Sequence, residues 1–204
     1  MVTRLTAAGA LVVAAALLAF LAHDVLAWRS AISDGDARFR THPEAATWRA
    51  GTWLPGDPAA RLLALDDDVA LRRGVQAFVM AVRTPRGFDN GETRARVRSG
   101  AEVRLEDLAA HAAPGAASQA GNLLGVLVAG TGQVTGGITA DDRARAAFEA
   151  AIRRDPGNPA AKYNLELLLR RTSAKATRQG PGSGSGSLGH GRRGAGSGTP
   201  GRGY

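Results

Sequence analysis

The longest apolar segment of the chain lies near its N-terminus. Residues 5–22 contain no charged side chain; Arg4 precedes them and Asp24 follows closely. At about 1.5 Å per helical residue, this run is just long enough to cross a hydrocarbon core of roughly 30 Å once residues 25–28 are partly included. The pattern predicts a transmembrane helix within residues 1–28.

A cleaved signal peptide is the alternative interpretation of the same segment. Val25, Leu26 and Ala27 satisfy the small-residue rule for cleavage before Trp28. The apolar run exceeds the usual 7–15 residues or so of a signal peptide, and Trp28 would suit a membrane interface, which favours an uncleaved anchor. Arg4 biases the short end to stay inside. We therefore expect a single-pass protein of the cell membrane whose C-terminal domain is extracytoplasmic.

Residues 29–117 are expected to be mostly helical, with one irregular segment. Apolar residues recur at near-helical spacing up to a break at residues 41–43, and again in residues 69–82. Residues 84–100 contain an Asn-Gly turn signal followed by arginines at every second position. That alternation predicts a short strand or an extended loop there.

Residues 141–171 carry the clearest helical pattern. Ala144, Phe148 and Ala151 share one apolar face, behind an expected cap and acidic first turn from Asp141 and Asp142. An Asp-Pro-Gly-Asn-Pro connection ends this helix and starts a second one. The second helix is expected to end at Arg171, after an apolar stripe of Tyr163, Leu165, Leu168 and Leu169. Two amphipathic helices with so short a link are expected to pack antiparallel.

These helices resemble a tetratricopeptide repeat, whose signature is W-x2-L-G-x2-Y, then A-x3-F, then P. Ala144 and Phe148 match the A-x3-F step, and Leu124 and Gly125 match the Leu-Gly pair. The Trp and Tyr of the first helix are replaced, and the interval before Ala144 exceeds the family spacing of about 12 residues. The resemblance covers residues 118–171, with these repeat positions: Leu124, Gly125, Ala144, Phe148, Ala151, Pro156, Tyr163 and Leu165.

The resemblance implies stacked hairpins with a groove that receives a peptide or another protein. The residues expected around that groove are Asn122, Lys162, Tyr163 and Glu166. Together with the apolar leader, the pattern is similar to membrane-anchored subunits that accompany MoxR-type AAA ATPases and von Willebrand A-domain proteins. The implied function is a scaffold or adaptor at the cell envelope, with such a protein complex and the lipid bilayer as partners.

The net charge of +8 is concentrated at the C-terminal end. Seven of the 26 Lys and Arg residues and none of the 18 acids lie after residue 169, so the rest of the chain is nearly neutral. Residues 172–204 are rich in Gly, Ser and Arg and are predicted to be disordered, because they have few apolar side chains to bury. A secreted or anchored protein that binds a polyanion through this tail is an alternative; nucleic acid is not the expected ligand.

Candidate chemistry is sparse along the whole sequence. The consecutive acids Asp66 to Asp68 suggest a divalent-cation site, yet their place directly before an apolar run is typical of a helix start. The four histidines are isolated from one another, and there are no cysteines. The segment GTGQVTGG satisfies neither phosphate-loop signature and is expected to be a flexible loop. No catalytic, cofactor or metal site is predicted, although an envelope enzyme with an unrecognised site stays an alternative.

Ala and Leu supply most of the apolar surface, and only 5% of residues are aromatic. This composition favours close-packed helices over sheets. The predicted fold class is mostly α: a transmembrane helix, a small domain of tetratricopeptide-like helical hairpins and a disordered tail.

Overall fold

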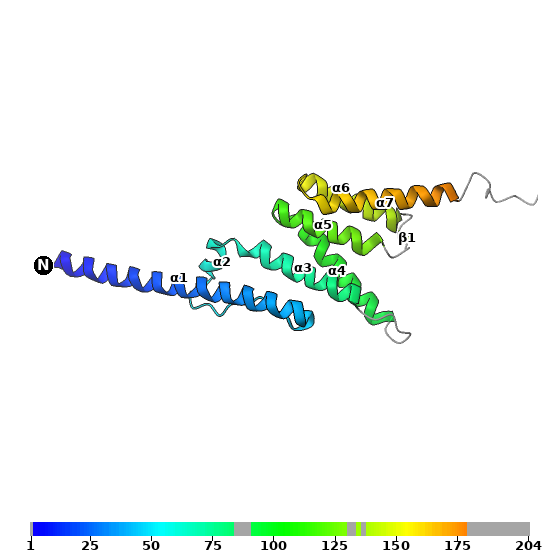
Figure 1. The fold of residues 1–204 in the computed structure, drawn as a ribbon. Coiled ribbons are helices and arrows are strands. Elements are labelled where there is room, and N and C mark those ends of the chain that lie inside the picture. Colours follow the sequence, from blue (N-terminus) through cyan, green and yellow to red (C-terminus); the bar gives the residue numbers. More distant parts are fainter. Residues whose placement is uncertain (1, 84–90, 130–133, 136–137, 179–204) are drawn as a thin grey trace, which may run out of the picture.

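The computed structural model describes residues 2–83, 91–129, 134–135 and 138–178, and most of these residues are helical (Figure 1). In chain order the elements are α1 (Val2–Thr41), the 3-10 helix η1 (Pro43–Ala45), α2 (Pro58–Leu62), α3 (Leu65–Arg83), α4 (Gly91–His111), α5 (Pro114–Ala129), β1 (Val134–Thr135), β2 (Ile138–Thr139), α6 (Ala140–Arg154) and α7 (Pro159–Arg178). The expected mostly α fold class is confirmed. The predicted disorder after residue 178 lies outside the described residues.

α1 is one continuous helix of 40 residues, about 60 Å long at 1.5 Å per residue. Residues Gly9 to Phe20 of this helix are exposed, whereas Leu21 packs against the buried cluster around Trp28 and Trp48. Within the described residues, it is the one helix that is long and apolar enough to cross a membrane. α1 runs without interruption through residue 28 and ends at Thr41, at the break that the sequence predicts for residues 41–43.

The second half of α1 packs against the segment from η1 to the start of α3. The buried side chains of this first core are Trp28, Ala46, Trp48, Ala59, Ala60, Leu65 and Val69. Trp28 Nε1 donates a hydrogen bond to Asp57 Oδ1 at 2.9 Å, and Trp48 Nε1 donates to Asp36 Oδ1 at 2.8 Å. Trp28 therefore belongs to the protein core, which corrects its expected place at a membrane interface. Its partners come from a later segment of the chain that local patterning does not reveal.

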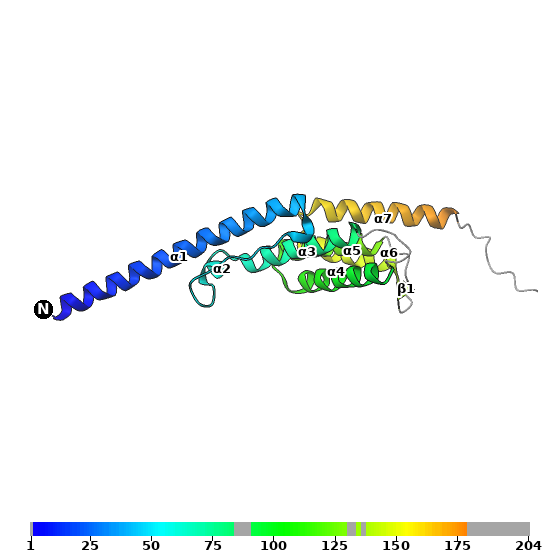
Figure 2. The same cartoon turned by 90° about the horizontal axis from the view of Figure 1, so that it is seen from below.

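Helices α3 to α7 pack in chain order, each against the next. α3 also contacts α5, and α5 also contacts α7, so that α3, α5 and α7 lie side by side (Figures 1 and 2). The central helix α5 is rich in small residues, and its buried positions face several neighbours at once: Ala117, Ser118, Ala120, Gly121, Gly125, Leu127 and Val128. Close approach of helix backbones at these positions holds the array together.

α4 begins at Gly91, which corrects the strand or extended loop expected up to residue 100. Leu105 and Leu108 are buried in the core between α3 and α5. Two i,i+4 ion pairs run along the helix, Glu92 with Arg96 and Arg98 with Glu102. Arginines at every second position fit a strand locally, but these pairs and the buried face stabilise a helix. Residues 84–90 of the same predicted segment lie outside the described residues.

The start of α6 differs slightly from the expectation. Thr139 is the N-cap: its Oγ1 accepts a hydrogen bond from the Asp142 backbone N–H at 3.1 Å, and the Asp142 carboxylate accepts one in return from the Thr139 backbone N–H. Asp141 and Asp142 therefore lie in the first turn and are not the cap. The described part of the preceding segment forms a two-stranded antiparallel ladder, where Val134 pairs with Thr139 and Thr135 with Ile138.

α7 begins at Pro159, as the sequence predicts, but ends at Arg178 instead of Arg171. Arg171 and Lys175 each donate a hydrogen bond to the Asp141 carboxylate, at 2.7 and 3.1 Å. These bonds tie the end of α7 to the start of α6, so the helix continues about two turns into the segment predicted as a tail. The predicted helix end at Arg171 is therefore wrong.

Candidate partner-binding groove

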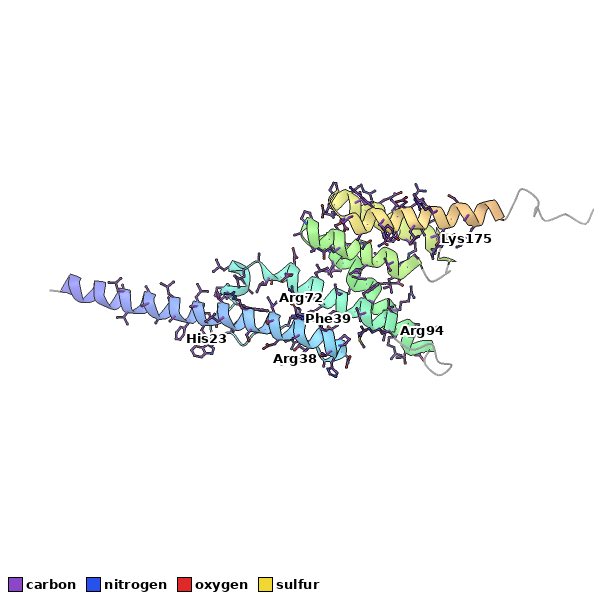
Figure 3. All side chains as sticks on the ribbon, in the orientation of Figure 1. His23, Arg38, Phe39, Arg72, Arg94 and Lys175 are labelled. Carbon is purple, nitrogen blue, oxygen red and sulfur yellow. The ribbon has the colours of Figure 1, made fainter. Side chains whose placement is uncertain are left out.

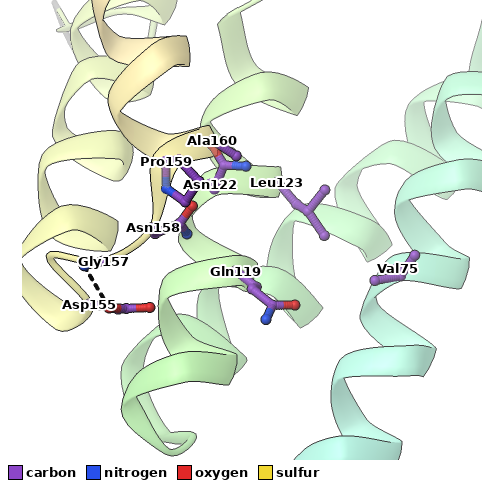
Figure 4. Close-up of a pocket in the computed structure, with 9 residues that line it drawn as sticks. All are labelled: Val75, Gln119, Asn122, Leu123, Asp155, Gly157, Asn158, Pro159 and Ala160. Carbon is purple, nitrogen blue, oxygen red and sulfur yellow. Dashed lines mark hydrogen bonds between the residues drawn. The ribbon is translucent and has the colours of Figure 1, made fainter.

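A groove of about 450 Å³ runs between α3, α5 and the start of α7 (Figure 4). Val75 of α3 forms one wall, opposite Leu123 and Gln119 of α5. The remaining lining comes from Asn122 and from the turn that leads into α7: Asp155, Gly157, Asn158, Pro159 and Ala160. Three helices that are separate in sequence thus contribute to one concave surface.

A second hollow, of about 340 Å³, adjoins the first because Val75 and Gln119 line both. Its other lining residues come from α1, from α3 and from the loop that carries Trp48: Asp36, Phe39, Trp48, Asp68, Leu71 and Arg72. We call the two hollows together the central groove. It extends from α1 past α3 and α5 to α7 and combines apolar walls with carboxylate, amide and guanidinium groups.

Small residues on α5 set the distance between the groove and the outer helix α6. A Cβ added to Gly125 would lie 2.7 Å from Phe148 Cδ1, and one added to Gly121 would lie 3.3 Å from Ala151 Cβ. The contact at Gly125 leaves no room for a side chain, and the contact at Gly121 is tight. Gly125 and Phe148 of the repeat signature therefore meet directly, with Ala144 and Ala151 buried beside them.

A buried polar chain attaches the turn before α7 to α5. Ser118 Oγ donates a hydrogen bond to the Ala151 carbonyl oxygen at 2.8 Å and accepts one from Asn158 Nδ2 at 2.9 Å. Asn158 Oδ1 accepts from the Ala161 backbone N–H at 3.1 Å and so caps the first turn of α7. Because Ser118 and Asn158 are buried, these bonds fix the end of the groove formed by the turn.

An ion pair joins α1 to α3 at the other end of the central groove. Figure 3 labels Arg72 of α3 and Phe39 of α1, which both line this end of the groove. Arg72 Nε donates to Asp36 Oδ1 at 2.9 Å, and Arg72 also pairs with Asp68 one turn earlier on α3. The hydrogen bond from Arg72 lowers the pKa of Asp36 below its ordinary value of 3.8, and a further bond from Trp48 adds to this, although partial burial opposes both. The Asp36 carboxylate in turn raises the pKa of Arg72.

Of the four residues expected around the groove, the structure brings one to it. Asn122 lines the central groove, and its Oδ1 accepts a hydrogen bond from Asn164 Nδ2 at 2.9 Å. Lys162, Tyr163 and Glu166 are exposed on α7 and do not contribute to the lining. The α7 surface that reaches the groove is its first turn, at Pro159 and Ala160.

Sequence reasoning missed most of the residues that line the groove. Gln119, Asn122 and Leu123 have i, i+3, i+4 spacing, which places them on one face of α5, but the rest of that helix is equally apolar or small. The sequence predicts the Asp-Pro-Gly-Asn-Pro connection only as a turn. Its contribution to a concave surface follows from the packing of α7 beside α5.

The repeat positions separate into core and surface residues. Gly125, Ala144, Phe148 and Ala151 are buried, and Leu124 and Leu165 are partly buried in the same core. Pro156 is exposed in the turn. Tyr163 is 64% and Leu169 40% exposed, so the expected apolar stripe of α7 reduces to Leu165 and Leu168. The helix packs against its neighbours through a narrower face than its sequence suggests.

The three acids Asp66 to Asp68 occupy the first turn of α3, as the helix-start interpretation predicts. Asp67 Oδ2 accepts a hydrogen bond from the Ala113 backbone N–H at 2.7 Å, which ties α3 to the link between α4 and α5. Among the described residues there is no group of three or more His, Asp or Glu side chains that could hold a metal ion.

No protein-family model, no curated protein and no solved structure matches this chain.

Proposed function

We propose that this protein is a membrane-anchored scaffold whose tetratricopeptide-like helices hold a protein partner in the central groove. The observation that carries this proposal is one concave surface shared by α1, α3, α5 and the first turn of α7. α4 packs against both α3 and α5, and α6 packs against both α5 and α7. In helical repeat arrays, such a surface is left open by the stacking of hairpins and commonly receives a peptide or another protein.

The chemistry of the central groove fits an extended polypeptide segment. The side-chain amides of Gln119 and Asn122 lie beside the apolar side chains of Val75 and Leu123, so both the peptide groups and the side chains of a bound segment would find partners. A shallow groove of this type favours a ligand that contacts several adjoining hollows. The resemblance to subunits of MoxR-type AAA ATPase and von Willebrand A-domain systems makes such a membrane complex our proposed partner.

The proposed anchor is the free part of α1. Residues 2–22 are helical, and 21 residues at about 1.5 Å each match a hydrocarbon core of about 30 Å. Cleavage after Ala27 would separate Asp24 from Trp53 and Leu54, whose backbone N–H groups it binds at 2.8 and 3.0 Å. The domain therefore favours an uncleaved helix. With Arg4 on the inner side, the helical domain is proposed to lie outside the cytoplasm.

Site-specific photo-crosslinking in intact membranes tests the scaffold proposal. A photoreactive amino acid replaces Gln119 in the central groove, and the matched control carries it at Val103, which is exposed on α4 outside the groove. We expect one discrete protein adduct from position 119 and none from position 103. Gln119→Arg should abolish co-purification of the same partner. Equal adducts from both positions, or no adduct from position 119, would contradict the proposal.

A further inference from the structure

An exposed aromatic cluster lies where α1 leaves the helical domain. The Trp53 ring stacks on His23 with centroids 4.2 Å apart, and Phe20 approaches it edge-on at 5.6 Å. Trp53 nevertheless remains 65% exposed, whereas Trp28 and Trp48 are buried. The chain therefore keeps one of its three tryptophans at the surface, at the level of α1 where its exposed apolar part ends.

The position of this tryptophan is rigidly tied to α1. Asp24 is fully buried, and its two carboxylate oxygens accept hydrogen bonds from the backbone N–H groups of Trp53 at 2.8 Å and Leu54 at 3.0 Å. Trp28, one turn further along, binds Asp57 of the same loop. A buried carboxylate with two backbone donors holds the loop at a defined height on the helix.

α2 presents a second apolar surface at the same end of the domain. Ala59 and Ala60 are buried against α1, while Leu62 is 68% exposed and Leu63 is also exposed. Figures 1 and 2 both show α2 as the helix of the domain nearest to the free end of α1, together with the loop that leads into it. Arg61, between these residues, is exposed as well.

The length of α1 fixes where this end of the domain would lie relative to a bilayer. If residues 2–22 span the hydrocarbon core, with the long Arg4 side chain reaching back to the inner interface, the polar headgroup region, which adds roughly 5–7 Å on each side, covers about the next four residues of the helix. That is the level of His23 and Asp24, and hence of the attached Trp53. No flexible linker separates the helix from the domain, because α1 is continuous to Thr41.

We propose that Trp53, Leu62 and Leu63 form a collar that inserts into the lipid headgroup region around the base of the anchor. This inference rests on the proposed membrane anchor and deepens it, since it assigns the domain a fixed height and tilt on the bilayer. Tryptophan favours this interface because its ring is apolar and its indole N–H is polar. Arg61 is placed to meet lipid phosphate groups.

The collar would hold the domain against the bilayer, unlike a domain that a flexible linker joins to its anchor. With three apolar side chains in the interface and a rigid helix, the central groove is held at a constant height above the membrane. Its partner would then be engaged close to the bilayer surface.

Spin labelling of the full chain in vesicles tests the collar, and the absence of cysteines makes single-site labels straightforward. Leu62→Cys reports on the collar, and Val103→Cys, which is 65% exposed on α4, is its matched control. Val12→Cys reports on the anchor itself. Each labelled chain is reconstituted into phosphatidylcholine–phosphatidylglycerol vesicles, where collisions with lipid-soluble oxygen and with a water-soluble nickel chelate are compared.

We expect the label at position 62 to collide with nickel several-fold less often than the label at position 103, and the label at position 12 to be the most protected. If position 12 is protected but position 62 is as accessible as position 103, the collar is wrong and the anchor stands. If position 12 is itself open to nickel, the anchor fails and the collar with it.

A second measurement keeps the test independent of labelling. Brominated phosphatidylcholine should quench the tryptophan emission of the native chain, and Trp53→Phe should remove most of the quenchable component, because the other two tryptophans are buried. Quenching that is unchanged in Trp53→Phe would overturn the placement of this residue in lipid.

Discussion

Gly125 of α5 lies directly against the ring of Phe148 of α6, where an added Cβ would come within 2.7 Å of Phe148 Cδ1. The ring is 2% exposed and belongs to the core between α5, α6 and α7. The contact joins the two helices at the centre of the array, and through α5 it positions the wall of the central groove.

Gly125→Ala should therefore destabilise the fold. The expected loss is about 1–3 kcal/mol, the usual cost of overpacking a filled core. Gly115→Ala in the same helix is the matched control, because a Cβ there meets nothing within 4 Å and should raise helix stability slightly. Thermal unfolding of the reconstituted chain, followed by circular dichroism, measures both. A Gly125→Ala variant as stable as Gly115→Ala would contradict the packing.

Asp24→Ala should loosen the loop attached to α1. The substitution leaves the backbone N–H groups of Trp53 and Leu54 without their acceptor, at an expected cost of about 1–3 kcal/mol. Hydrogen exchange of those two amides should accelerate strongly. Asp34→Ala removes an exposed carboxylate from the same helix, where its partner is the Ser30 hydroxyl, and should leave both amides protected. Equal exchange in the two variants would argue against the assigned role of Asp24.

The stability of the interface between α1 and α3 should depend on pH in the acid range. The folded pKa of Asp36 is lowered by its hydrogen bond with Arg72, so folding favours the ionised carboxylate. This contribution is fully present above the ordinary pKa of 3.8 and is lost as the pH falls through the lower, folded value. The free energy of unfolding, measured in urea from pH 6 down to about pH 2, should fall less steeply with decreasing pH in Asp36→Asn than in the native chain. An acid limb identical to that of the native chain would refute the assignment.

Ser118→Ala should weaken the connection between α5 and the turn before α7. It removes the donor to the Ala151 carbonyl oxygen and leaves the buried Asn158 Nδ2 without its acceptor, at an expected cost of about 1–3 kcal/mol. Because the turn lines the central groove, the photo-crosslink from position 119 should also diminish. Ser99→Ala, at an exposed position of α4, is the control and should change neither the stability nor the crosslink. Loss of the crosslink in both variants would show that the effect is not specific to the turn.

Local sequence patterns predict a helix correctly where the apolar spacing or a proline is unambiguous. The apolar run of residues 5–22, the proline-bounded start of α7 and the shared face of Ala144, Phe148 and Ala151 were all recognised in advance. The strand expected around the alternating arginines was wrong, since pairing between successive helical turns and burial of Leu105 decided in favour of a helix. The predicted end of α7 is too early because Lys175 donates a hydrogen bond to Asp141, which holds the later turns of the helix against α6.

Sequence alone determined the helical class, the length of the apolar leader and the principal breaks, because these follow from neighbouring residues and from the periodicity of one helix. Tertiary structure alone decided that Asp24 supports Trp53, that Trp28 is buried, and that Val75 and Gln119 share a groove with the turn before α7. Those relationships join positions about 30 or more residues apart along the chain. They depend on how whole helices pack, and no local pattern of apolar and polar residues encodes that packing.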